Sequence, residues 1–305
     1  MVSYIIRRLI QGALIVWATA SLAFGLTFLS GDPATLMIQD HWTDEQVVKF
    51  REYMGYDRPF YVQYFEFLGR LMHGEFGLSV RQNLPVSMLI LERFPATLEL
   101  TGAGLLIIVG VSIPVGILSA VYRNSIWDAL VMGATLLTQS MPVFVLGTIL
   151  ILIVAVRLQW LPISGRGSLR YLILPALTLS SYSTARNARV VRSSMLDVLG
   201  EDYIRTARGK GLSEKLVIFR HALQNALIPV VTMLGLEMGN LLSGAVITES
   251  VFAWPGIGRL LIQAIYARDY PLVQGAITFI AMIFVGVNLL VDISYAFLNP
   301  RIRYE

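Results

Sequence analysis

The sequence predicts an all-α membrane protein with six transmembrane helices. Of its 305 residues, 55% are hydrophobic and only 14% are charged, and the mean hydropathy is +0.65. Soluble domains carry about a quarter charged residues, so this chain is too apolar for that class. Two further observations support the prediction: long charge-free runs recur along the chain, and arginine and lysine are concentrated between two of them.

The apolar runs set the number of predicted spans. A helix needs about 20 apolar residues to cross a hydrocarbon core of about 30 Å. The six candidate runs are residues 9–31, 100–122, 129–156, 171–185, 222–248 and 272–291. The fourth run alone gives a helix of only about 22 Å, so it spans only if the helix continues past Arg186. The fifth run is interrupted only by Glu237.

Flanking charge predicts the orientation of these spans. Arg7 and Arg8 precede the first run, which places the N-terminus in the cytoplasm by the positive-inside rule. Six spans then also put residues 186–227, rich in arginine and lysine, and the tail at 301–305 in the cytoplasm. The first run is too long for the apolar part of a signal peptide, and no small-residue cleavage motif follows it. We therefore expect a retained, multi-pass chain with both termini cytoplasmic.

Residues 32–99 form the predicted extracytoplasmic loop region of a single transmembrane domain, 1–305. Residues 44–54 have helical character, and 61–72 carry aromatic residues and leucine at helical spacing. The residues that break these helices are Pro59, Gly74, Gly77 and Pro85. The segment is too short for a large core of its own.

The polar stretch 200–229 is the most informative part of the chain. It predicts a short basic helix over 203–210, a break at Gly211, and a second helix that Ser213 and Glu214 would cap. The sequence RTARGKG (205–211) keeps an alanine at 207 and a glycine at 211, and HALQNALIP (221–229) follows it. This pattern resembles the cytoplasmic coupling loop of ABC importer permeases, in the variant of their dipeptide, oligopeptide and nickel branch.

The resemblance extends over nearly the whole chain. The stretches GDPA (31–34), DRPFYVQY (57–64), ERFPATLEL (92–100) and FAWPGIG (252–258) are similar to that branch in the same order. It implies the ABC importer permease fold, with a cytoplasmic coupling helix, in a bacterial inner membrane. The implied partners are a paralogous permease subunit, two ATP-binding subunits, an extracytoplasmic substrate-binding protein and membrane lipid.

The resemblance also implies which residues couple transport to ATP hydrolysis. These residues are Tyr203, Arg205, Thr206, Ala207, Arg208, Lys210 and Gly211. The chain itself lacks a phosphate-binding loop, because no serine or threonine follows Lys210 and Ile204 stands where the motif's first glycine belongs. ATP and magnesium are therefore expected in the partner subunits, with no cofactor on this chain.

Composition argues against several other functions. The chain has no cysteine and only three widely separated histidines, so neither a thiol nucleophile nor a catalytic or structural metal site is expected. The net charge of +4 is explained by orientation and by contact with anionic lipid, without nucleic acid. No catalytic residue is assigned, and the chain is predicted not to be an enzyme.

Two groups of polar or bent positions are candidates for the translocation path. Glu237 lies in an apolar run within a G-x-x-x-G spacing, and intramembrane carboxylates face a cavity or a partner. It is either a path residue or a packing residue paired with arginine or asparagine. Gln139 and Met141 precede Pro142, which should kink the helix. A path-lining role and simple Pro-kinked packing both remain open there.

Residues 249–274 are too apolar for an ordinary solvated loop. Trp254 could belong to an interfacial aromatic belt, or the helix after Pro255 could fold back into the bundle. The resemblance implies a third role, an extracytoplasmic gate that includes Phe252, Trp254 and Pro255 and receives the binding protein. We expect the apolar side chains to be packed rather than exposed.

Two other classes of protein are compatible with such a composition. An ion-gradient-driven secondary transporter would show several paired intramembrane charges and inverted repeats, yet only Glu237 is clear. A membrane-embedded enzyme would need a His/Asp or Ser/His set within the spans, and every histidine lies outside the predicted spans. The predicted function is a permease subunit of an ATP-driven, binding-protein-dependent importer. Small peptides are the expected substrates, with glutathione and nickel or a nickel chelate as alternatives.

Overall fold

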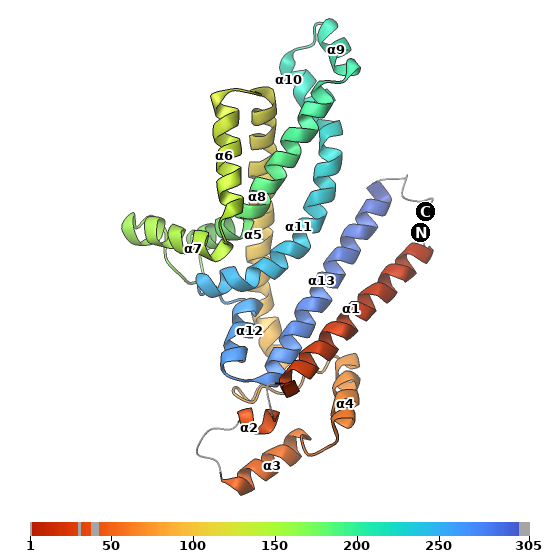
Figure 1. Ribbon diagram of the computed structural model, residues 1–305, viewed down its shortest axis with the longest axis vertical. Helices are drawn as coiled ribbons and strands as arrows, with labels where there is room; N and C mark the ends of the chain where they lie inside the picture. The colour runs from red at the N-terminus through yellow and green to blue at the C-terminus, as the bar shows by residue number, and fades with distance from the viewer. Residues whose placement is uncertain (1, 30–31, 38–42, 299–305) are drawn as a thin grey trace. The chain divides into compact units, whose positions relative to one another are not determined.

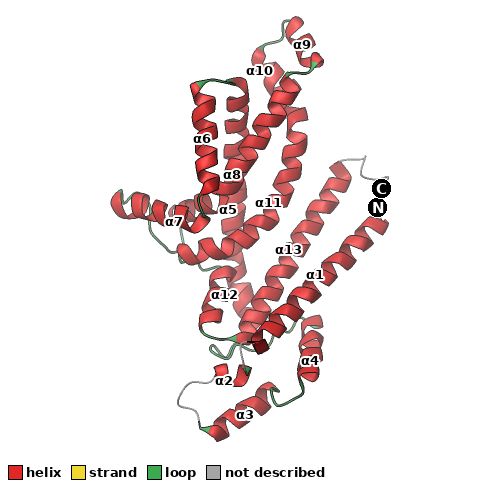
Figure 2. Ribbon diagram, viewed as in Figure 1, coloured by secondary structure: helices red, strands yellow, loops and turns green. Residues whose placement is uncertain are grey.

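The computed structural model describes residues 2–29, 32–37 and 43–298. This part of the chain is mostly helix joined by loops and contains no strand beyond one isolated bridge between Leu78 and Pro85 (Figure 2). The predicted all-α class is confirmed. The chain divides into two compact units, residues 1–97 with 255–305 and residues 98–254. The predicted cytoplasmic tail at 301–305 lies outside the described residues.

The first unit is built on two long helices from opposite ends of the chain. Helices α1 (Val2–Leu29) and α13 (Tyr270–Leu298) run side by side (Figure 1). Gly12 allows this close approach, because a Cβ atom there would lie 2.5 Å from Cγ1 of Val285. Helix α12 (Ile257–Tyr266) packs against α13 in the same unit.

Three short helices follow α1, and two of them were predicted. Helix α2 is Pro33–Met37, α3 is Asp44–Met54 and α4 is Phe60–Met72. Thr43 begins α3 with a reciprocal capping box, and Gly55, at φ +73°, ends it. Helix α4 packs on α1 through stacked rings, with the centroids of Phe24 and Phe67 5.3 Å apart.

Helix α5 (Val86–Val121) begins well before the predicted apolar run at 100–122. Its 36 residues make a helix of about 54 Å, much longer than a bilayer core. The first turns are held in the first unit, where Val86 and Ile90 are buried among Leu260 and Leu272. The last part of the predicted loop region 32–99 is therefore helix.

The second unit contains a sharp bend at the proline that the sequence singled out. Two residues separate helix α6 (Ile126–Ser140) from helix α7 (Val143–Leu150). Helix α7 continues as a π-helical turn, Ile151–Arg157. The two helical segments meet at 109° around Pro142 (Figure 1). The predicted kink is confirmed, but the run 129–156 is two helices rather than one straight span.

Helix α8 (Leu169–Leu199) is the centre of the second unit and contacts α6, α7 and α11 (Figure 1). Helix α9 (Asp202–Gly209) follows it, and α10 (Glu214–Leu216) leads through the π-helical turn Val217–Ala222 into α11 (Leu223–Val251). Glu214–Val251 forms one apolar helix of 38 residues. The second helix of the polar stretch is therefore the beginning of this long helix.

Within the described ranges, four helices are long and apolar enough to cross a membrane: Ile5–Leu29, Val86–Val121, Glu214–Val251 and Tyr270–Ile293. The bent pair around Pro142 makes a fifth if its two parts count as one span. Helix α8 is long enough, at about 46 Å, but its second half carries Arg186, Arg189 and Arg192. The sixth span, which depends on α8, stays a prediction.

Candidate functional site

The predicted coupling loop is a short amphipathic helix fixed to the second unit by its apolar side. Ile204 and Ala207 of α9 are buried in a cluster with Met195, Val217 and Ile218. Among the predicted coupling residues, the exposed side chains are Tyr203, Arg205, Thr206, Arg208 and Lys210, and the acid Asp202 is exposed beside them. Five of the seven predicted coupling residues therefore form an outward surface. Ala207, which the sequence analysis placed in the contact, packs inward instead.

Gly211 ends α9 in a left-handed conformation, with φ +76°. The amide groups of Gly211 and Leu212 donate to the carbonyl oxygens of Arg208 and Ala207 at 2.9 and 3.4 Å, which closes the C-terminus of the helix. A Cβ atom at Gly211 would meet nothing within 4 Å, so the backbone angle rather than space calls for glycine. The predicted break is confirmed.

Two polar links hold α9 against the start of the next helix. The Arg208 guanidinium donates to both carboxylate oxygens of Glu214, at 2.6 and 3.1 Å, and holds the pKa of that carboxyl below its ordinary value. Asn225 donates to the Tyr203 hydroxyl at 2.9 Å. The pair is thus ionised at neutral pH, and Arg208 is partly engaged within the chain. Sequence reasoning did not identify these links.

A shallow depression of about 570 Å³ is lined by residues that follow α9 in the sequence. It lies along the first turns of the long helix that begins at Glu214. Its lining residues are Ser213, Lys215, Leu216, Phe219, Arg220 and Gln224. Phe219 is 58% exposed, an unusual position for a large apolar side chain among charged neighbours. The basic helix and this apolar patch together form a surface suited to a protein partner.

The predicted gate segment is packed, as expected. Phe252 and Trp254 are 1% and 0% exposed, which excludes the aromatic-belt interpretation for Trp254. Phe252 packs with Ala155 and Leu174 in the second unit, and a Cβ atom on Gly147 would lie 3.2 Å from its ring. The turn is tight, since the Trp254 amide donates to the Glu249 carbonyl at 2.8 Å.

The segment continues into the first unit after Pro255, which is half-buried. Ile257 starts α12, and its amide donates to the Thr97 hydroxyl at 2.9 Å. Its side chain is buried with Leu89 and Leu260. FAWPGIG is therefore a buried connection between helices rather than a solvated loop.

Glu237 lies buried between α11 and α8, surrounded by donors. Ser183 donates to its carboxylate at 2.6 Å, Asn187 at 3.3 Å and Asn240 at 3.4 Å. An Arg186 guanidinium nitrogen is 4.0 Å away. This is the geometry of the packing interpretation, in which arginine and asparagine pair with the acid. A role of Glu237 in the path stays a prediction.

Gln139 also contacts α8, through Arg189, whose guanidinium donates to the Gln139 side-chain oxygen. Met141 stands at the bend and is 40% exposed. Two of the predicted path residues, Gln139 and Glu237, thus meet neighbouring turns of α8. That part of α8 is the polar half that sequence reasoning assigned to a cytoplasmic loop.

Two buried acids that the sequence analysis did not single out bind side chains or amide groups that are distant in the sequence. Asp128 forms a bidentate ion pair with Arg192, at 2.7 and 2.8 Å. Asp269 accepts from the Ser79 hydroxyl and from the amide groups of residues 80, 81 and 272. Ser125 before Asp128 is a local cap signal, but neither long-range partner has a signature in the sequence.

Comparison with known families covers most of the chain. Residues 112–304 match the family described as "Binding-protein-dependent transport system inner membrane component". Residues 1–101 match the family described as "Binding-prot-dependent transport system membrane comp, N-term". The second of these covers α1 to α4 and the start of α5, and the first covers the candidate coupling loop and the gate segment.

Individual relatives resemble the chain over its whole length. It is 40% identical over 339 residues to the dipeptide transport system permease protein DppB of Escherichia coli strain K12. It is 42% identical over 307 residues to the glutathione transport system permease protein GsiC of the same strain and of Shigella dysenteriae serotype 1. Each comparison covers 100% of both chains.

Proposed function

This chain belongs to the family of binding-protein-dependent transport system inner membrane components, and we propose that it forms the membrane pathway of an ATP-driven importer of small peptides. The observation that carries the proposal is the full-length similarity to permeases of dipeptide and glutathione systems. Both names denote short peptides or a peptide derivative. Nickel, considered from the sequence, has no support in these names.

The exposed surface of α9 is proposed as the contact with the ATP-binding subunits. It exposes Arg205, Arg208 and Lys210 beside the acid Asp202. Ile204 and Ala207 fix it from behind, and the exposed Phe219 stands at the start of the next helix. A helix fixed in this way transmits a push to the segment on which it packs, here the π-helical turn Val217–Ala222 that leads into α11. Gly211 keeps the short helix separate from the long one.

The assembly proposed around this chain has four kinds of partner. They are a paralogous permease subunit, two ATP-binding subunits, an extracytoplasmic binding protein and the membrane lipid. ATP and magnesium would be bound by the ATP-binding subunits. We propose that both termini and the segment 186–227 face the cytoplasm, since arginine and lysine are concentrated there.

The proposal is tested by transport in proteoliposomes that contain the chain with its partner subunits and binding protein. We expect uptake of a labelled dipeptide that requires ATP and continues when ion gradients are collapsed. Uptake that persists without ATP and stops with the gradient would instead identify a secondary transporter. Parallel assays with glutathione distinguish the two peptide classes, and uptake of neither would reject the proposed substrates.

A further inference from the structure

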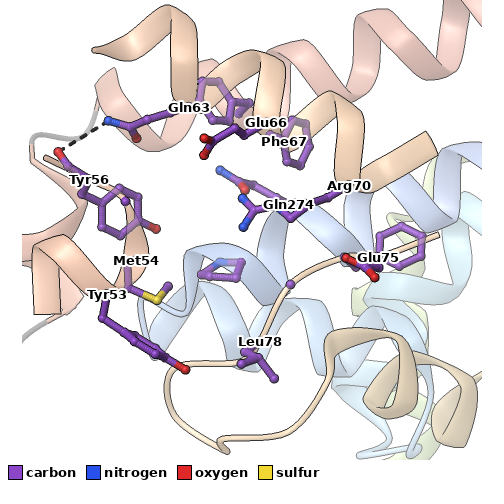
Figure 3. Close-up of a pocket in the computed structure, with 15 residues that line it drawn as sticks. Tyr53, Met54, Tyr56, Gln63, Glu66, Phe67, Arg70, Glu75, Leu78 and Gln274 are labelled. Carbon is purple, nitrogen blue, oxygen red and sulfur yellow. Dashed lines mark hydrogen bonds between the residues drawn. The ribbon is translucent and has the colours of Figure 1, made fainter. Parts of the chain in front are cut away.

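A pocket of about 290 Å³ lies in the first unit among α1, α3, α4, residues 75–78 and the start of α13 (Figure 3). Its size is at the lower end of the range for small-molecule sites. Part of the lining is aromatic, with Phe24, Phe67 and Phe76, and the rest includes polar and charged side chains. Neither the predicted coupling loop nor the gate segment contributes to it.

Arg70 supplies the pocket with a cation. It lies in the last turn of α4, and its side chain extends into the pocket (Figure 3). Within the described ranges its guanidinium forms no ion pair and no hydrogen bond. The neighbouring arginines differ, because Arg51 pairs with Asp32 and Arg58 pairs with Glu66. Arg70 can therefore bind an anionic group.

Tyr56 and Gln274 stand around the same space (Figure 3). Burial raises the pKa of the Tyr56 hydroxyl, and the Arg70 guanidinium lowers that pKa by a smaller amount. The hydroxyl thus remains protonated at neutral pH and can donate to an acceptor. The Gln274 amide is oriented by its bond to the Thr27 hydroxyl, at 3.1 Å.

The negative charges of the pocket restrict the anion that fits. Glu66 is paired with Arg58, while Glu75 forms no ion pair among the described residues. The unpaired charges of Arg70 and Glu75 then sum to about zero, which disfavours a multiply charged anion and favours a zwitterion. The Glu75 amide donates to the Arg70 carbonyl at 2.9 Å, so both residues come from one tight turn.

We propose that this pocket binds the free carboxylate end of a short peptide, with Arg70 as its main contact and the Tyr56 hydroxyl as a second donor. The aromatic wall covers an apolar side chain of the peptide, and Glu75 faces its ammonium group. This inference rests on the proposed function, because it places a peptide site on the segment between α1 and α5. Paired, charge-assisted hydrogen bonds favour a free carboxylate over an uncharged amide, which is the discrimination that such a site needs.

The inference is tested by equilibrium dialysis of labelled alanyl-phenylalanine against the full chain in lipid nanodiscs. We expect the free peptide to bind about tenfold more tightly than its C-terminal amide, as for the loss of one charged hydrogen-bond pair. Arg70→Gln should bind both forms equally, and Arg70→Lys should retain part of the preference. Arg123→Gln, the same change at an exposed arginine elsewhere, should retain all of it.

Glu75→Gln gives a second, independent readout. It should weaken binding of the free peptide, and N-acetylation of the peptide should then cause no further loss. The inference is overturned if the chain does not bind the peptide, or if Arg70→Gln keeps the preference for the free carboxylate. ATP-driven uptake by the full assembly without such binding would reject this pocket and leave the proposed function intact.

Discussion

Asp269 is the residue that ties residues 79–81 to the start of α13. Its buried carboxylate accepts four hydrogen bonds, three of them from residues 79–81. Asp269→Ala should leave those donors unpaired and destabilise the chain by about 3 kcal/mol. Thermal unfolding in detergent measures this loss. Asp57→Ala, a change at an exposed acid, is the control, and an equal melting temperature for the two variants would contradict the assignment.

Among the residues that the structure describes, Trp254 is the largest side chain that is completely buried. Trp254→Ala should destabilise the chain by about 3–5 kcal/mol, because the surrounding side chains cannot fill the space. If the segment is a gate, the variant should also raise basal ATPase activity or substrate leak in the assembled transporter. Trp127→Ala is the matched control, because the Trp127 side chain is 68% exposed. Unchanged leak with lowered stability would leave Trp254 a packing residue only.

At the scale of a helix, the two sides of α9 should respond differently to substitution. Arg205→Glu on the outer side should leave the fold intact and weaken stimulation of the partner ATPase by at least about tenfold, through charge reversal in the contact. Ala207→Asp on the inner side should instead unfold the loop, because it buries a charge. Limited proteolysis separates the two effects. Normal coupling in Arg205→Glu would remove α9 from the interface.

Helix α7 packs tightly against its neighbours at Gly147. A Cβ atom there would lie 3.1–3.3 Å from side chains of Thr178, Phe252 and Val251. Gly147→Val should therefore cost about 1–3 kcal/mol and disturb the gate segment through Phe252. Gly133→Val is the control in α6, where an added Cβ meets nothing within 4 Å. Equal stability and equal leak in the two variants would show that the contact is dispensable.

At the scale of the whole molecule, the proposed topology can be tested because the chain has no cysteine. The substitutions His73→Cys and Lys210→Cys would each introduce a single cysteine at an exposed position, the first after α4 and the second after α9. Ser79, in the same predicted extracytoplasmic region as His73, is unsuitable for labelling because its side chain is only 1% exposed. An impermeant maleimide on intact spheroplasts should label position 73 and spare position 210. The opposite pattern would reverse the orientation, and labelling of both would reject the span count.

The sequence by itself determined the features that depend on near neighbours. Apolar runs located the long helices, Pro142 located the bend, and Gly211 located the break after the basic helix. Each of these three features follows from backbone geometry or from the transfer of a short segment out of water. None of them depends on a residue that is distant in the sequence. The family resemblance rested on motifs of the same local kind.

Only the tertiary structure decided which distant side chains meet. Asp269 and Ser79 are 190 residues apart, and Asp128 and Arg192 are 64 apart. Burial of Ala207, and the donors around Glu237, depend on how α8, α9 and α11 are rotated about their axes. Helix rotation is set by packing over the whole face of a helix, and no short motif encodes it. For that reason the pocket around Arg70 was also invisible before the helices were placed in three dimensions.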